Sequence, residues 1–310
     1  MKLIDHIHAS GGKLTSFKSY CGGLVAPEYN NNPWGYKFSW NPRNVVLAGQ
    51  GTAQFMEQGV YKYIPYNRLF TQIETIEVEG YGKFEGYANR DSLSYRKLYH
   101  LDDIPTMLRG TLRMPGFCKA WNVFVKLGLT DDSYKIEASD KLTYAELLQA
   151  LLPKGTQSLK EKLHNLMGAD MTQEIWEKLE WLGITGDRKI RLANATPAQL
   201  LQDLLEEKWK LNEEDKDMIV MQHLIEYKNA KAENKRITSS LVVKGDDQLH
   251  TAMAKTVGIP LAIVSKLILQ NKINAKGVVI PTLKEIYDPV LNELEDFGVK
   301  FEEKEIYNAM

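Results

Sequence analysis

The feature that most constrains the fold of this chain is the spacing of its apolar residues, which changes from strand-type to helical and back to strand-type along the sequence. Residues 60–86 and the run Met107–Arg113 set apolar side chains among polar ones as β-strands do. Between residues 116 and 215 the spacing becomes helical. Strand-type sequence then returns in Asp217–His223 and Arg236–Val243, which flank a polar turn and predict a hairpin. We therefore predict an α/β (α+β) fold: a central mixed sheet, interrupted by an all-α insertion.

The helical block carries its own start signals. Thr143–Glu146 and Thr196–Gln199 both have the capping-box pattern, in which the first and fourth residues satisfy each other's backbone N–H groups. The second box also has Pro197 in the first helical position, where proline is favoured. Leucines follow each box at helical spacing, which supports an all-α block.

Both ends of the chain alternate helix and strand. A helix from about Ile4 stops at Gly11-Gly12, because glycine adopts the left-handed conformation that ends helices, and a strand follows to Phe17. An α/β unit that opens on a helix leads us to expect further sequence upstream. Near the other end we predict, in order, an apolar helix over 247–270, a strand at Gly277–Pro281, a helix at Asp288–Phe297 and a strand at Val299–Glu302.

Composition excludes several classes of protein. The 310 residues carry 39 basic and 40 acidic side chains, and a net charge of -1 gives no general attraction to nucleic acid or anionic lipid. The longest apolar stretch, from Ile259 to Leu269, contains a lysine and is too short to span a bilayer. Two cysteines and six scattered histidines form no disulfide framework or metal spacing. We expect a soluble cytoplasmic protein without a metal site.

No nucleotide motif is evident. A dinucleotide needs a glycine-rich turn that opens a helix, and Gly80–Gly86 has the wrong spacing and lies in strand-type sequence. The clearest chemical signal is cationic instead. In a strand over Met107–Arg113, Arg109, Thr111 and Arg113 share one face, while Leu108 and Leu112 face the core.

Arginines that converge on one face are suited to gripping carboxylates. Arg90 lies at the end of a neighbouring strand-type run and extends this set. The alternative is that the arginines form a solvated face or pair with acidic residues close in sequence, namely Asp91, Asp102 and Asp103.

Cys21 is a second candidate. It stands beside Gly22 and Gly23 in a turn-rich stretch, residues 18–50, where glycines indicate a close approach of another backbone. The alternative is a small buried packing residue. His223, on an apolar strand, is expected to be a satisfied core histidine.

Six segments, in this order along the chain, resemble saccharopine reductase, the glutamate-forming saccharopine dehydrogenase family: Cys21–Glu28, Asn32–Trp40, Asn89–Ser92, Arg109–Phe117, Asp217–His223 and Thr256–Pro260. The resemblance implies an N-terminal Rossmann domain whose glycine fingerprint is absent from this chain. It also implies a central domain for binding saccharopine and forming a homodimer. The implied domains are residues 1–20 as a Rossmann remnant, 21–115 with 216–246 as the central domain, 116–215 as the insertion, and 247–310 returning to the nucleotide domain.

The resemblance also implies roles for individual residues. Saccharopine binding falls on Arg90 and on Thr111, Leu112 and Arg113, whereas Arg109 is expected to pair internally. Cys21 would lie near the reacting carbon as a candidate acid/base. Asn41 would contact the NAD or NADP cofactor at a position that is typically serine in the family.

In this family saccharopine is oxidised at its secondary amine with NAD(P)+, and glutamate and 2-aminoadipate 6-semialdehyde are released. Two alternatives stay open: a related amine dehydrogenase, such as carboxynorspermidine dehydrogenase, or a non-catalytic dimeric binding module. We expect the chain to be inactive alone. Its last segment should leave apolar surface uncovered around Ile259, Leu261 and Ile263.

Overall fold

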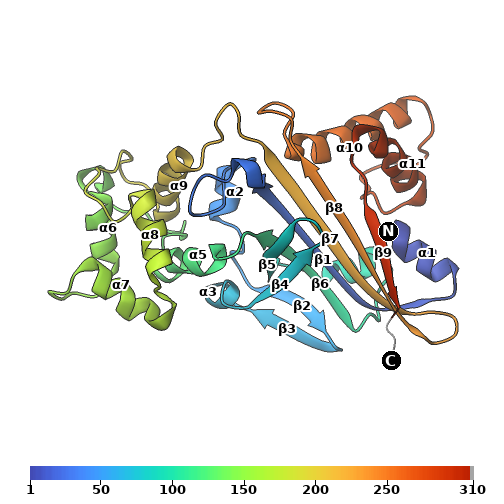
Figure 1. Ribbon diagram of the computed structural model, residues 1–310, viewed down its shortest axis with the longest axis horizontal. Helices are drawn as coiled ribbons and strands as arrows, with labels where there is room; N and C mark the ends of the chain where they lie inside the picture. The colour runs from blue at the N-terminus through green and yellow to red at the C-terminus, as the bar shows by residue number, and fades with distance from the viewer. Residues whose placement is uncertain (308–310) are drawn as a thin grey trace.

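The computed structural model describes residues 1–307, which form one mixed sheet flanked by two groups of helices (Figure 1). The strands are β1 (Lys13–Val25), β2 (Ala53–Glu57), β3 (Val60–Ile64), β4 (Ile73–Val78), β5 (Gly82–Ala88), β6 (Thr106–Arg113), β7 (Asp217–Lys228), β8 (Asn234–Lys244) and β9 (Glu302–Tyr307). Helix α1 (Lys2–Ala9) precedes β1, and the short helices α2 (Pro42–Val46), α3 (Tyr66–Leu69) and α4 (Ser94–Leu98) connect the first strands.

The sheet has the order β3-β2-β6-β1-β7-β8-β9, and β5 joins β4 to β6 beside this path. β1 and β6 run parallel, while β1–β7, β7–β8 and β5–β6 are antiparallel. The predicted mixed sheet, the hairpin and the strand at Met107–Arg113 are therefore confirmed. The register sets Cys21 directly beside Thr111, so both side chains point to the same face.

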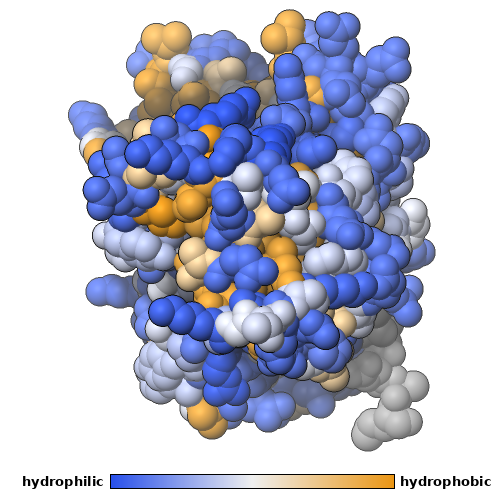
Figure 2. All heavy atoms as spheres, turned by 90° about the vertical axis from the view of Figure 1, so that its left-hand side faces the viewer, coloured by the Kyte–Doolittle hydropathy of each residue, from blue (hydrophilic) through white to orange (hydrophobic). Residues whose placement is uncertain are grey.

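The insertion is helical as predicted. It comprises α5 (Phe117–Lys126), α6 (Tyr144–Leu151), α7 (Leu159–Met167), the single turn η3 (Gly168–Asp170), α8 (Gln173–Leu182) and α9 (Pro197–Lys208). Both expected capping boxes are present, at Thr143 and Thr196. The helices gather at one end of the molecule in Figure 1. On the outer face of this end, shown in Figure 2, polar side chains predominate and apolar ones show between them.

At the other end, α10 (Ala252–Leu269) and α11 (Lys284–Leu294) pack on β7 and β8 through a separate apolar cluster. The carboxylate of Asp217 fixes α10, because its two oxygens accept the N–H groups of Ala252 at 2.6 Å and Met253 at 3.0 Å. The predicted helix over 247–270 is confirmed. Leu261 is 69% exposed, as expected, but Ile263 is buried.

Two expectations for the last segment are wrong. Gly277–Pro281 forms no strand; its valines and isoleucine are exposed in a loop, and none of its backbone pairs with a strand of the described chain. A strand needs a neighbouring strand for its N–H and C=O groups, which an apolar run alone does not supply. The last strand is β9, which begins at Glu302 and not at Val299, and pairs with β8.

The first strand also differs from expectation. Cys21-Gly22-Gly23 lies inside β1, not in a turn, and β1 runs unbroken across residue 20. The reason is the close approach of β6: a Cβ at Gly22 would stand 2.8 Å from the backbone oxygen of Leu112. Glycine is therefore needed at position 22 because a side chain there would collide with Leu112, and the close approach of another backbone that the glycines indicated is present. The residue keeps the extended backbone of a strand.

Among the described residues, α10 is the one helix long and apolar enough to cross a membrane by length and composition. A single helix of this kind is weak evidence for a membrane span, since buried core helices and signal sequences meet the same criterion. One side of α10 packs on the sheet through Ile263 and Leu267, and two of its lysines form ion pairs, Lys255 with Asp246 and Lys266 with Glu293.

Candidate functional site

The centre of the candidate site is Arg113, the last residue of β6. Its side chain is only 3% exposed, and its guanidinium lies among three aromatic rings, 5.1 Å from the centroid of Tyr36, 5.3 Å from Phe117 and 6.0 Å from Tyr87. Nη1 donates to the carbonyl of Leu112 at 3.2 Å, whereas Nε is buried with no hydrogen-bond partner. Among the described side chains, no carboxylate forms an ion pair with Arg113. A buried guanidinium without an anion is energetically unfavourable.

The acidic residue paired with Arg113 across the sheet is engaged elsewhere. Glu85 stands directly opposite Arg113 in the β5–β6 pairing. Its two carboxylate oxygens instead accept the backbone N–H groups of Gly116 and Cys118, each at 2.8 Å. These groups lie at the start of α5, whose N-cap residue Gly116 has no side chain to cap the helix. Capping of α5 by Glu85 is therefore what leaves Arg113 without an anion.

Thr111 and Cys21 lie next to Arg113 on the same face of the sheet. They are register partners on the parallel strands β6 and β1. Burial raises the pKa of the Cys21 thiol above its ordinary value, and the positive charges of Arg113 and Arg109 offset part of that shift. The thiol is therefore protonated at neutral pH. Leu112 faces the opposite side and is fully buried, so only its backbone is available to the site.

The other two arginines are differently placed. The guanidinium carbon of Arg109 lies 3.7 Å from the centroid of the Tyr95 ring, a close cation–π contact. Arg90 is exposed, and its backbone carbonyl accepts the N–H of Gln54 at 2.7 Å. Neither arginine forms an ion pair within the described part of the chain. The alternative in which they pair with nearby acids is thus unsupported; Asp91, for example, accepts backbone N–H groups at the start of α4.

Asn41 lies on a different part of the surface, at the start of α2. Its Oδ1 accepts the N–H of Arg43 at 2.9 Å, which caps that short helix. The residues on either side, Trp40 and Pro42, line an open hollow of about 410 Å³ beside the start of α10. The hydroxyl of Ser39, also in this lining, is buried without a hydrogen-bond partner.

The structure thus brings Cys21, Thr111 and Arg113 together, with Arg90 and Asn41 set apart at exposed positions. Sequence reasoning missed Glu85 and the aromatic enclosure of Arg113. The signal for Glu85 was present: α5 opens at Gly116 without a Ser, Thr, Asp or Asn cap, so an acid from another element had to supply one. His223 is a satisfied core histidine, as predicted, with Nδ1 2.9 Å from the hydroxyl of Ser19.

Fold and site together define a mixed α/β domain that buries a guanidinium with no carboxylate partner among the described side chains. The family model of the saccharopine dehydrogenase C-terminal domain matches residues 1–299. The chain belongs to this family.

Two relatives illustrate the match. The chain is 34% identical over 314 residues to saccharopine dehydrogenase [NADP(+), L-glutamate-forming] of Saccharomyces cerevisiae, and the match covers 99% of this chain and 70% of the yeast protein. It is 38% identical over 313 residues to mitochondrial alpha-aminoadipic semialdehyde synthase of Mus musculus, covering 97% of this chain and 33% of the mouse protein. The chain thus spans about a third of the animal relative.

The solved structures agree. The apo, histidine-tagged saccharopine dehydrogenase (L-Glu forming) from S. cerevisiae superposes with a TM-score of 0.87 at 35% identity, covering 98% of this chain and 70% of that one. The expected mixed α/β fold is confirmed.

Proposed function

We propose that this chain is the substrate-binding part of an oxidoreductase of lysine metabolism that oxidises saccharopine. The observation that carries the proposal is Arg113, a buried guanidinium with no carboxylate of its own. Saccharopine has three carboxylates, and an arginine fork grips a carboxylate through two parallel hydrogen bonds. The names of the fungal relatives, which specify saccharopine and glutamate, support the same substrate.

The reaction would proceed at the secondary amine. The carbon on the lysine side of the nitrogen loses a hydride and the nitrogen loses its proton, which gives an imine. Water hydrolyses the imine, and glutamate and 2-aminoadipate 6-semialdehyde are released. In this scheme Arg113 and Thr111 hold one carboxylate, with the backbone of Leu112, and the exposed Arg90 holds another. Cys21 holds a proton beside them, since burial keeps its thiol neutral.

NADP+ would accept the hydride when bound, in keeping with the NADP(+) in the names of the fungal relatives. The residues present fit one end of such a cofactor. The hollow beside Asn41 offers the buried hydroxyl of Ser39 and the ring of Trp40, which is 40% exposed. The described part of the chain has no glycine-rich turn opening a helix, so the phosphates would bind outside it.

We also propose that a nucleotide-binding domain covers the apolar surface formed by α10 and the loop after it. Leu261 on α10 and Val278 in the loop are among the most exposed apolar side chains of the molecule. Apolar patches that stay exposed mark interfaces. The relatives are long enough to hold such a domain, because the chain spans 70% of the yeast enzyme.

The proposal includes a soluble, cytoplasmic homodimer. The edge strand β3 supports pairing between copies, because three of its five residues, Val60, Tyr61 and Tyr63, expose apolar or aromatic side chains. An unprotected edge strand is a template for a further strand. Light scattering of the purified chain measures the oligomeric state directly.

The function is tested by titrating saccharopine into the purified chain in a calorimeter. We expect saturable binding that weakens about tenfold to a hundredfold in Arg113→Ala, the loss of one charged hydrogen-bonded contact. Arg68→Gln, an exposed arginine on α3, is the matched control and should bind as the native chain does. In a full-length enzyme, Arg113→Ala should raise the KM for saccharopine by a similar factor.

Three outcomes would change the assignment. Turnover of carboxynorspermidine but not saccharopine by a full-length enzyme would identify an amine dehydrogenase of different specificity. Saccharopine binding without NADP-linked turnover in a full-length protein would identify a binding module. An unchanged KM in Arg113→Ala would remove Arg113 from the site.

A further inference from the structure

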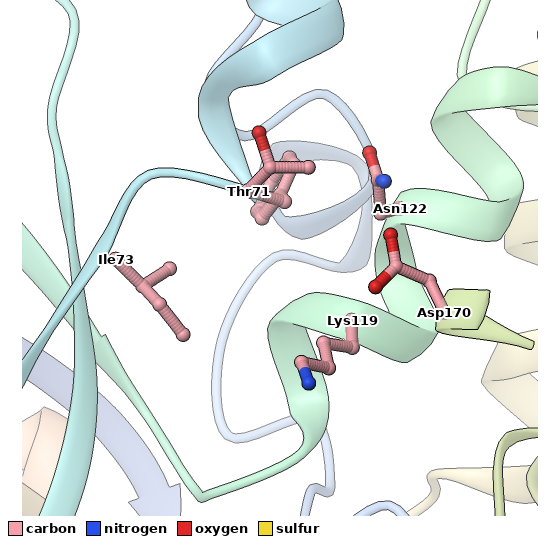
Figure 3. A pocket seen from close by; sticks show the side chains of 6 residues that line it. Thr71, Ile73, Lys119, Asn122 and Asp170 are labelled. Atoms are coloured by element: carbon pink, nitrogen blue, oxygen red, sulfur yellow. The ribbon is translucent and has the colours of Figure 1, made fainter. Parts of the chain in front are cut away.

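A second cavity lies away from Arg113, between the α3–β4 connection, α5 and η3. Its volume is about 110 Å³. Six residues line it: Phe70, Thr71, Ile73, Lys119, Asn122 and Asp170. Figure 3 shows Asn122 and Asp170 on one side and Ile73 on the other, with the Lys119 side chain extending from α5 below them in the view. None of these residues belongs to the site described above.

Asn122 is the unusual member of this lining. It is 2% exposed and stands on α5 between Trp121 and Val123, both buried in the core. Its Oδ1 has no hydrogen-bond partner. A buried amide oxygen without a donor is unfavourable, and native proteins rarely keep one without a reason. The same residue is part of the cavity lining.

The two charged residues of the lining are also unpaired. Lys119 and Asp170 are both exposed, and within the described part of the chain neither forms an ion pair, with the other or with any other side chain. The cavity therefore offers one positive group, one negative group and one buried acceptor. Phe70 and Ile73 add an apolar wall.

We propose that this cavity binds a small zwitterionic α-amino acid. The ammonium group meets the Asp170 carboxylate and the Asn122 oxygen, the carboxylate meets Lys119, and a short apolar side chain lies against Phe70 and Ile73. A simple anion would face Asp170, and a simple cation would face Lys119, so the lining discriminates against both. A cavity of about 110 Å³ limits the ligand to a small amino acid.

The test is titration of L-valine into the purified chain, followed by amide or methyl NMR shifts. Two analogues isolate the charges: 3-methylbutanoate lacks the ammonium group and isobutylamine lacks the carboxylate. We expect saturable binding of valine and at least about tenfold weaker binding of each analogue. Equal binding of 3-methylbutanoate, or no saturation by valine up to about 50 mM, would overturn the proposal.

Variants localise the site. Asp170→Asn and Lys119→Gln should each weaken valine binding at least about tenfold. Their matched controls are Asp187→Asn and Lys126→Gln, exposed residues of the same insertion, which should leave it unchanged. Arg90→Gln should also leave it unchanged, because the valine carboxylate does not use the saccharopine site. Loss of binding in a control and not in the lining variants would overturn the proposal.

Asn122→Leu separates a ligand-binding role from a structural one. Leucine has the same branched shape and the same number of heavy atoms as asparagine, and it removes the unpartnered oxygen, so the melting temperature should not fall, while valine binding should weaken at least about tenfold. A structural asparagine would give the reverse: a lower melting temperature and unchanged binding. That result would overturn the proposed contact.

Discussion

Lys37 and Arg113 are two equally buried cations, and the fold treats them in opposite ways. Each is 3% exposed. The Nζ of Lys37 lies 2.5 Å from a carboxylate oxygen of Asp215, which is itself buried, whereas Arg113 has no acidic partner among the described side chains. Lys37 lies in the connection between β1 and α2 and Asp215 in the connection between α9 and β7, so their pair joins two connections that are far apart in sequence. A cation with its own anion serves the fold, and a cation without one is available to a ligand.

His223 shows a third way to bury a basic side chain. Its ring is stacked between Phe17 and Phe301, with centroids 6.0 and 5.5 Å away. Burial lowers its pKa from the ordinary 6.5 to about 4, so the imidazole is neutral at physiological pH. Lys37 is neutralised by a partner and His223 by loss of its proton. Arginine cannot lose its proton, which leaves Arg113 dependent on a ligand.

The largest effect is expected at Lys37. Lys37→Met leaves Asp215 buried and unpaired, and breaking a buried pair in this way typically costs about 3–5 kcal/mol. Urea unfolding measures the loss. The double variant Lys37→Met/Asp215→Leu should recover most of it, because no uncompensated charge then remains. A loss below about 1 kcal/mol in the single variant would contradict the structural role of the pair.

His223 predicts a pH dependence of stability. The unfolded chain binds this proton near pH 6.5 and the folded chain only near pH 4, so the unfolded state holds more protons between these values. The free energy of unfolding should therefore fall by about 2–3 kcal/mol as the pH drops from 6.5 to 4, and level off below.

Urea unfolding across this pH range, repeated with His223→Phe, isolates the contribution. Phenylalanine keeps the stacking and cannot take a proton, so the slope should flatten. His164→Gln, an exposed histidine on α7, is the control and should leave the slope as it is. An unchanged slope in His223→Phe would assign the pH dependence to other groups.

Arg113→Met should behave unlike Lys37→Met. Methionine keeps contact with Tyr36, Phe117 and Tyr87, and the lost cation–π attraction is offset by removal of a buried unpaired charge. We expect the free energy of unfolding to change by less than about 1 kcal/mol. A loss of 3 kcal/mol or more would mean that Arg113 is a structural cation like Lys37.

Periodicity predicted most of the fold. The alternation over Met107–Arg113 and the capping boxes at Thr143 and Thr196 are local patterns, and each formed the predicted element. Local pattern failed where the outcome depended on a distant neighbour. Gly22 stays in a strand because β6 crowds it, and Gly277–Pro281 has the composition of a strand with no strand beside it.

The candidate site divides in the same way. The shared face of Thr111 and Arg113 follows from the two-residue period of a strand. The absence of a carboxylate partner for Arg113 does not follow from that period. It depends on Glu85, which caps a helix more than thirty residues away in sequence. Lys37 and Arg113 look alike in the sequence; only the positions of Asp215 and Glu85 distinguish them.

The smallest expected effect is on Cys21, and it reports the charge of Arg113 directly. Burial raises the pKa of this thiol, while Arg113 and Arg109 lower it by a smaller amount. Replacing Arg113 with Met removes one of the two cations that favour the thiolate, so the pKa should rise further, by up to about one unit.

The measurement is the rate of alkylation by iodoacetamide as a function of pH. Both proteins carry Cys118→Ala, so that Cys21 is the one thiol. We expect the midpoint of the native chain above the usual range for cysteine, and that of Arg113→Met above it again. Saccharopine should raise the native midpoint and leave the Arg113→Met midpoint unchanged, because a bound carboxylate neutralises the same guanidinium. If neither the Arg113→Met substitution nor saccharopine shifts the midpoint, the charge of Arg113 does not influence the Cys21 thiol. The proposed coupling between the unpaired guanidinium of Arg113 and the proton on Cys21 would then be wrong.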